Sequence, residues 1–160
     1  MTESAGACND SDSAWGRRAA WLLLVALVLR VIMAFLVTSH VDGQGRQFLI
    51  EGDAGGYWEL AEKMAAGDEY AIHTPPRRIL RTPGFPSLLA LVIAVCGPKL
   101  LAARLVLAVI GTLCCAATFS LGRSLASARV GCFALAYVAL HPLHDGTSVL
   151  VLSELSLIHI

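Results

Sequence analysis

Three apolar runs dominate the pattern of hydrophobic and polar positions along the chain. They cover residues 19–39, 100–122 and 130–144, and a long polar stretch separates the first from the second. About 20 apolar residues in a helix cross the roughly 30 Å hydrocarbon core of a bilayer. We predict a transmembrane helix for each run, and hence an all-α integral membrane protein of the multi-pass helical-bundle type.

Residues 53–66, within the polar stretch, have the spacing of an amphipathic helix. One face carries Tyr57, Leu60, Ala61 and Met64. On the other face Glu59 and Lys63 stand four positions apart, the spacing of a helical ion pair. Gly67 is expected to end this helix. Such a helix would lie at the membrane interface.

A second short helix is predicted over residues 84–97, between the segment Pro83–Pro86 and the pair Gly97-Pro98. It would be about 21 Å long, which is too short to cross a bilayer comfortably. We interpret it as re-entrant or interfacial. Residues 40–99 then form one loop that carries two interfacial helices.

Basic residues predict the orientation of the chain. Arg17 and Arg18 precede the first run, and arginines bound the link 123–129. Cytoplasmic segments next to membrane spans are enriched in Lys and Arg. We therefore expect residues 1–18 to be a disordered cytoplasmic tail, and residues 40–99 to lie on the extracytoplasmic face of the cell membrane.

Arg30 stands near the middle of the first run. A cation at that depth costs roughly 2.5–3.5 kcal/mol on insertion scales. We expect Arg30 to face other helices or a wet cavity. Snorkelling after a shift of the span is the alternative.

Residues 147–160 read as the start of a fourth helix. From Val149 to Ile160 it would reach about 18 Å, where about 30 Å is needed. We therefore expect the chain to be an N-terminal fragment, inactive alone. Residues 155–160 resemble the translation of a transposon-derived sequencing adapter, and the alternative is that they continue the native helix.

Composition supports a membrane protein. The chain is 56% hydrophobic and 15% charged, whereas soluble domains carry about 25% charged residues. Its formal net charge of zero argues against a nucleic-acid partner. The five cysteines form no CxxC pair, so they do not indicate a metal site.

Several short segments follow one another over residues 18–154. A first helix with an internal Arg precedes the loop segment 53–67 (DAGGYWELAEKMAAG) and the segment 81–86 (RTPGFP), and the Arg-bounded link precedes an ending from Pro142 to Glu154. In this order they resemble the C-type (GT-C) membrane glycosyltransferases, which include protein mannosyltransferases and bacterial aminoarabinose transferases. The resemblance implies sugar transfer from a polyprenyl-phosphate donor.

The resemblance also implies roles for single residues. Family members carry a catalytic acid early in the first outer loop with Tyr four positions later, which Asp53 and Tyr57 match. A carboxylate there would take the acceptor's proton or steady an oxocarbenium ion. Asp53 also suits a helix N-cap, and Tyr57 an interfacial aromatic anchor. Many members have a second acid where this chain has Ala54, so a divalent cation on Asp53 stays open. Glu154 matches an acid at the start of the fourth helix.

Arg77, Arg78 and Arg81 crowd the loop before the Pro-Gly-Phe-Pro turn. Arginine suits bidentate phosphate contacts, so these residues are candidates for binding the lipid-phosphate donor. Attraction to lipid headgroups is the competing interpretation. The alternative function is a transporter or a non-enzymatic membrane subunit, which would place its ionisable residues within the spans. The sequence leaves open the sugar, the acceptor and the lipid carrier.

The first prediction concerns orientation. In a Cys-free background, a cysteine replacing Gly67 should react with an impermeant reagent in intact cells, because the loop is expected outside. A cysteine replacing Ser127, in the basic link, is the control and should react only after membrane rupture. The reverse pattern would contradict the orientation.

Overall fold

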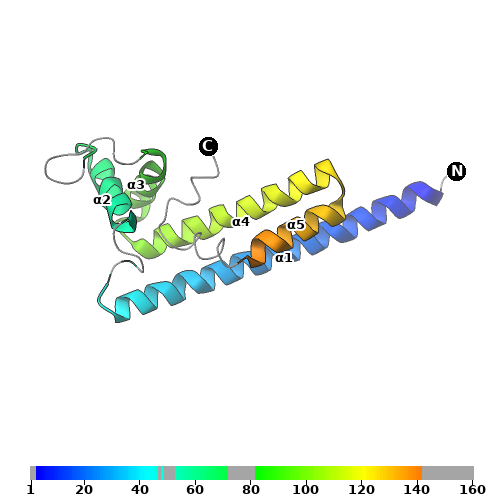
Figure 1. Ribbon diagram of the computed structural model, residues 1–160, viewed down its shortest axis with the longest axis horizontal. Helices are drawn as coiled ribbons and strands as arrows, with labels where there is room; N and C mark the ends of the chain where they lie inside the picture. Colours follow the sequence, from blue (N-terminus) through cyan, green and yellow to red (C-terminus); the bar gives the residue numbers. More distant parts are fainter. Residues whose placement is uncertain (1–2, 47, 49–52, 72–81, 142–160) are drawn as a thin grey trace.

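The described part of the protein is entirely helical. The computed structural model describes residues 3–46, 48, 53–71 and 82–141 (Figure 1). Two stretches, Ala14–Gly43 and Leu100–Leu125, are long and apolar enough to span a membrane. The all-α class is therefore confirmed and is compatible with a helical membrane protein. In chain order the helices are α1 (Glu3–Gly43), α2 (Asp53–Ala66), α3 (Gly84–Cys96), α4 (Leu100–Leu125) and α5 (Ala128–Leu140).

The two long helices, α1 and α4, lie side by side and run in opposite directions (Figure 1). Arg30 contacts Cys115, and further along α1 Thr38 contacts Arg104, so residue numbers rise on one helix as they fall on the other. Small side chains allow the two backbones to approach closely. Those buried on the inner face of α1, about two turns apart, are Ala19, Ala26 and Ala34.

A tight turn joins α4 to α5. Ser127 caps α5 by accepting a hydrogen bond from the N–H of Val130 at 3.3 Å. Two glycines face each other at the closest approach: a Cβ on Gly122 would lie 2.8 Å from the Cα of Gly131. Glycine is required there because each position abuts backbone of the other helix. Helix α5 also packs on α1. Buried side chains of α1, α4 and α5 therefore form a hydrophobic core at this end of the molecule.

The shorter helices α2 and α3 form a separate layer at the far end of the α1–α4 pair (Figure 1). Tyr57 meets Phe85 edge to face, with ring centroids 5.3 Å apart. Leu60 and Ala61 are fully buried, so the predicted apolar face of α2 points inward. The core continues to Leu107 on α4. We call this the α2–α3 end, and the opposite one the hairpin end.

Gly67 ends α2, as the sequence predicts. Its φ of 78° lies in the left-handed region. Its N–H donates to the Met64 carbonyl at 3.2 Å, and the Asp68 N–H donates to the Lys63 carbonyl at 2.8 Å. This is the Schellman arrangement, in which a left-handed glycine satisfies the last carbonyl groups of a helix.

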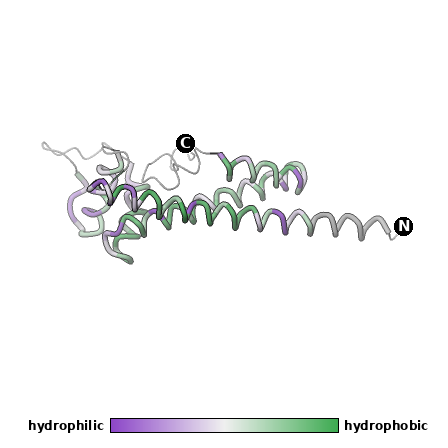
Figure 2. Tube along the Cα trace, turned by 90° about the horizontal axis from the view of Figure 1, so that it is seen from below, coloured by the Kyte–Doolittle hydropathy of each residue, from purple (hydrophilic) through white to green (hydrophobic). Residues whose placement is uncertain are grey.

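Large apolar side chains are exposed along the two long helices. Phe35, Leu36 and Leu113 are 52%, 58% and 62% exposed. Figure 2 shows hydrophobic positions along these helices and hydrophilic positions near the α2–α3 end. Soluble monomers rarely expose large contiguous apolar surfaces. The exposure is therefore compatible with a lipid environment.

The N-terminal prediction needs correction. A disordered tail was expected over residues 1–18, but the backbone is helical from Glu3 onward. Once a helix is nucleated, each added residue gains a hydrogen bond at little further cost. The long apolar segment supplies that nucleus, so the helix extends back into residues whose polar composition alone predicts disorder.

The third predicted span also differs from the structure. It was expected over residues 130–144, whereas α5 ends at Leu140 and is about 20 Å long. His141 has extended backbone angles, φ −77° and ψ 117°. It precedes Pro142 in the sequence, and a residue before proline disfavours helix. The predicted fourth helix, residues 147–160, lies outside the described residues.

The second prediction tests the turn between α4 and α5. Gly131→Ala would bring a Cβ to 2.7 Å from the Phe119 carbonyl oxygen. We expect destabilisation of about 1–3 kcal/mol, the usual cost of overpacking, measured as earlier thermal unfolding in detergent. Gly16→Ala is the control, because a Cβ there meets nothing within 4 Å. Equal unfolding of Gly131→Ala and the wild type would contradict the close approach.

Candidate functional site

The sequence-predicted site residues are only partly within the described structure. Asp53 is the first residue of α2. Tyr57 follows one turn later, half-buried against Phe85. The other candidates lie outside the described residues: Arg77, Arg78, Arg81 and Glu154. The described structure therefore tests only where Asp53 and Tyr57 lie along α2.

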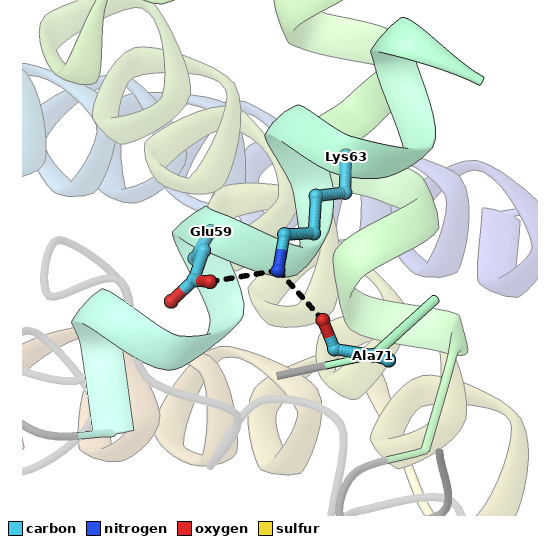
Figure 3. Close-up of polar contacts among 3 residues, drawn as sticks. All are labelled: Glu59, Lys63 and Ala71. Atoms are coloured by element: carbon cyan, nitrogen blue, oxygen red, sulfur yellow. Dashed lines mark hydrogen bonds and ion pairs between the residues drawn. The ribbon is translucent and has the colours of Figure 1, made fainter. Parts of the chain in front are cut away.

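The predicted ion pair on α2 is present. Lys63 Nζ lies 2.9 Å from Glu59 Oε1, and it also donates to the Ala71 carbonyl at 2.7 Å (Figure 3). Lys63 thereby ties the segment after Gly67 back onto the helix. An exposed ion pair of this kind contributes roughly 0.3–0.5 kcal/mol to stability. Its main effect is therefore to position Lys63, which holds the segment around Ala71 against α2.

A second polar pair lies on another face of α2. The indole N–H of Trp58 donates to Glu62 Oε1 at 2.8 Å. Trp58 is buried, while Glu62 is exposed. The hydrogen bond fixes the direction of the Glu62 carboxylate relative to the helix.

This face of α2 borders a cavity of about 540 Å³ at the α2–α3 end. Parts of α1, α2 and α4 line it, together with the short link before α4. Its polar and aromatic lining residues are Thr38, Asp42, Trp58, Glu62, Lys99 and Arg104. Two carboxylates and two cations from distant parts of the sequence therefore border one space.

Arg104 is the buried cation of this cavity, with only 3% of its surface exposed. Its Nη1 donates to the hydroxyl oxygen of Thr38 at 2.6 Å. The Thr38 hydroxyl in turn donates to the Ala34 carbonyl at 2.7 Å. This chain of hydrogen bonds links α4 to α1 and fixes the guanidinium beside the cavity.

Arg30 occupies the same helix contact, nearer the hairpin end. It is 1% exposed, and its two terminal nitrogens donate to the Ala26 carbonyl at 3.3 Å and to Cys115 Sγ at 3.6 Å. The prediction that Arg30 faces other helices is confirmed, and snorkelling is excluded. Arg30 does not line the cavity.

Basic residues converge at the hairpin end. The guanidinium carbon of Arg18 lies 4.4 Å from the centre of the Trp15 ring, and that of Arg129 lies 5.7 Å from it. Both distances are within the range of cation–π attraction. The structure therefore brings the arginines before the first span and those of the link to one end of the bundle.

Sequence reasoning did not single out the cavity residues. A signal was present in two places. Trp58 and Glu62 stand four positions apart on α2, the spacing of a side-chain pair on a helix, and Arg104 stands in an apolar helix just as Arg30 does. A cation that faces lipid is costly, and for this reason Arg30 was expected to face other helices. The same reason predicts that Arg104 also faces other helices or a wet cavity.

Within the described residues, no group of three or more His, Cys, Asp or Glu side chains is placed to hold a metal ion. Comparison with known proteins gives no identification: no protein family, curated protein or solved structure matches the chain. What the fold and the site define is a helical protein with two candidate membrane spans and a charged cavity at one end.

Proposed function

We propose that this chain is part of a GT-C-type membrane glycosyltransferase, which moves a sugar from a polyprenyl-phosphate donor to an acceptor on the extracytoplasmic face. The observation that carries the proposal is the α2–α3 layer at one end of two candidate spans. It begins with Asp53 and borders a charged cavity. A small folded layer beside a charged cavity suits reaction at a membrane surface.

The proposal includes the orientation expected from the sequence. The arginines around Trp15 gather at the hairpin end, opposite the α2–α3 end. Since Lys and Arg are enriched on the cytoplasmic side, this supports a cytoplasmic hairpin end. Further spans from residues 130–144 and 147–160 belong to the proposed GT-C bundle.

In this proposal Asp53 is the catalytic carboxylate, which acts as the general base, and Tyr57 contacts the substrate. As the first residue of α2, Asp53 stands where the N–H groups of the first turn point outward and favour a carboxylate. Tyr57 packs edge to face against Phe85. A divalent cation, if the reaction uses one, would bind Asp53.

The third prediction tests Asp53. In the gene product that carries this chain, Asp53→Asn should lower sugar transfer about 10²–10⁴-fold, the usual loss on removing a general base. Folding should be unaffected, because Asn caps a helix nearly as well as Asp. Radiolabel transfer in isolated membranes measures the effect.

Asp68→Asn is the matched control, because Asp68 is exposed on the segment after α2. It should transfer sugar at the wild-type rate. Near-normal turnover by Asp53→Asn would reduce Asp53 to a helix cap.

The fourth prediction concerns the donor. Replacing either Arg78 or Arg81 by Gln should weaken donor binding about 10–100-fold, because a charged hydrogen bond contributes about 1.5–3 kcal/mol, and should change acceptor binding less. Arg46→Gln, at an exposed position early in the same 40–99 loop, is the control. Unchanged donor affinity would assign the arginines to lipid headgroups.

A transporter is the second candidate, and one observation favours it. Arg30 and Arg104 are buried between two candidate spans, where transporters place ionisable residues. Uptake of a solute by proteoliposomes, without sugar transfer, would support the transporter. Sugar transfer without uptake would support the enzyme.

A further inference from the structure

The cavity at the α2–α3 end has polar groups that are already fixed in direction. Arg104 is held by Thr38 at 2.6 Å, and Glu62 is held by the indole N–H of Trp58 at 2.8 Å. Its volume of about 540 Å³ falls in the range of about 300–1,000 Å³ typical of small-molecule sites. Fixed donors and acceptors that converge on a space of this size are a property of ligand sites.

We infer that this cavity binds the head group of a phosphorylated polyol. Arg104 and Lys99 hold the phosphate, and Trp58, Glu62 and Asp42 contact the hydroxyl-bearing part. The inference rests on the proposed function for the class of donor. It adds the residues of this cavity to the loop arginines as contacts of the donor's head group.

The phosphate half of the site follows from its cations. Arg104 is buried, and its planar guanidinium suits the oxygens of a phosphate. Lys99 lines the same cavity at an exposed position, so it adds a point charge near the opening. An anion drawn into the cavity would meet both charges.

The polyol half follows from the carboxylates. A bare phosphate would be repelled by Asp42 and Glu62, which border the same space. Hydroxyl groups, in contrast, donate to carboxylates in charge-assisted hydrogen bonds. Trp58 is buried at the edge of the cavity, and its indole N–H fixes the Glu62 carboxylate. The ligand that matches all five residues carries both a phosphate and several hydroxyls.

The position of the cavity determines how deep in the membrane the bound ligand would lie. It lies where α1 ends and α4 begins, at one end of both candidate spans, and Leu100 and Leu101 complete its wall. A lipid-linked sugar phosphate presents its head at this level with its chain in the bilayer. A free sugar phosphate has the same head group and could enter the cavity from water. The experiment must therefore distinguish a lipid-linked ligand from a free one.

The fifth prediction tests this site by calorimetric titration of the chain in phosphatidylcholine nanodiscs. The ligands are inorganic phosphate, glucose 1-phosphate and a short-chain polyprenyl phosphoglucose. We expect the two sugar phosphates to bind more tightly than inorganic phosphate. Arg104→Gln and Lys99→Gln should each weaken them about 10–100-fold, as loss of a charged hydrogen bond does.

Arg129→Gln is the matched control for Lys99→Gln. It removes an exposed cation at the hairpin end, outside the cavity, so ligand binding should not change. Lys99 is exposed, so its variant gives an answer even where Arg104→Gln does not fold. Glu62→Gln should reduce the preference for glucose 1-phosphate over inorganic phosphate.

Binding of only the lipid-linked ligand would support the site and identify a membrane source, whereas binding of glucose 1-phosphate as well would show that the head alone is recognised. Wild-type affinity in both Arg104→Gln and Lys99→Gln, or binding of none of the ligands, would overturn the inference. Equal weakening by Arg129→Gln would overturn it too.

The titration measures binding and does not require sugar transfer. The proposed enzyme and the proposed binding site can therefore be tested separately. Binding by this chain, together with no sugar transfer by the gene product that carries it, would remove the proposed enzyme and leave the site. Sugar transfer together with normal binding by Arg104→Gln would remove the site and leave the enzyme.

Discussion

Two arginines must be buried between apolar helices, and the rest of the arrangement depends on that constraint. A lipid-facing cation costs roughly 2.5–3.5 kcal/mol on insertion scales. Arg30 belongs to α1 and Arg104 to α4, and they are 1% and 3% exposed. Each helix therefore has one rotation that turns its cation toward the other helix. Small residues on α1, such as Ala26 and Ala34, leave room for the guanidinium groups and for close backbones.

The rotation of α1 also determines what reaches the cavity. Residues four apart lie on one face of a helix, so the row that contains Arg30 and Ala34 continues to Thr38 and Asp42. Thr38 thus meets Arg104, and Asp42 reaches the cavity lining. One face of α1 therefore carries the buried Arg30 in its middle part and Asp42 near its C-terminal end. The charged cavity is a continuation of the helix contact.

The sequence predicted the features that are determined by residues close together in the chain. The helix over 53–66 follows from its amphipathic spacing and from Gly67, whose left-handed backbone ends it. The inward direction of Arg30 follows from desolvation alone. The helical extension to Glu3 was missed because polar composition predicts disorder when helix propagation from an adjacent apolar segment is not considered.

The cavity could not be predicted in the same way. Asp42, Glu62, Lys99 and Arg104 come from separate segments, and only the packing of α1, α2 and α4 brings them together. A sequence shows that each is charged, but not which charges share a space.

The depth of each arginine bears on the choice between an enzyme and a transporter. A translocation path needs ionisable groups along the length of the bundle, whereas a surface reaction needs them at one end. Arg104 lies at the α2–α3 end, beside the carboxylates, while Arg30 is enclosed by Ala26 and Cys115 and does not reach the cavity. Within the described residues, the carboxylates and cations of the cavity are thus gathered at the α2–α3 end, whereas the arginines around Trp15 lie at the hairpin end. Arg30 has a structural explanation as the residue that fixes the rotation of α1. The position of the cavity therefore supports the proposed reaction at the membrane surface more than the transporter.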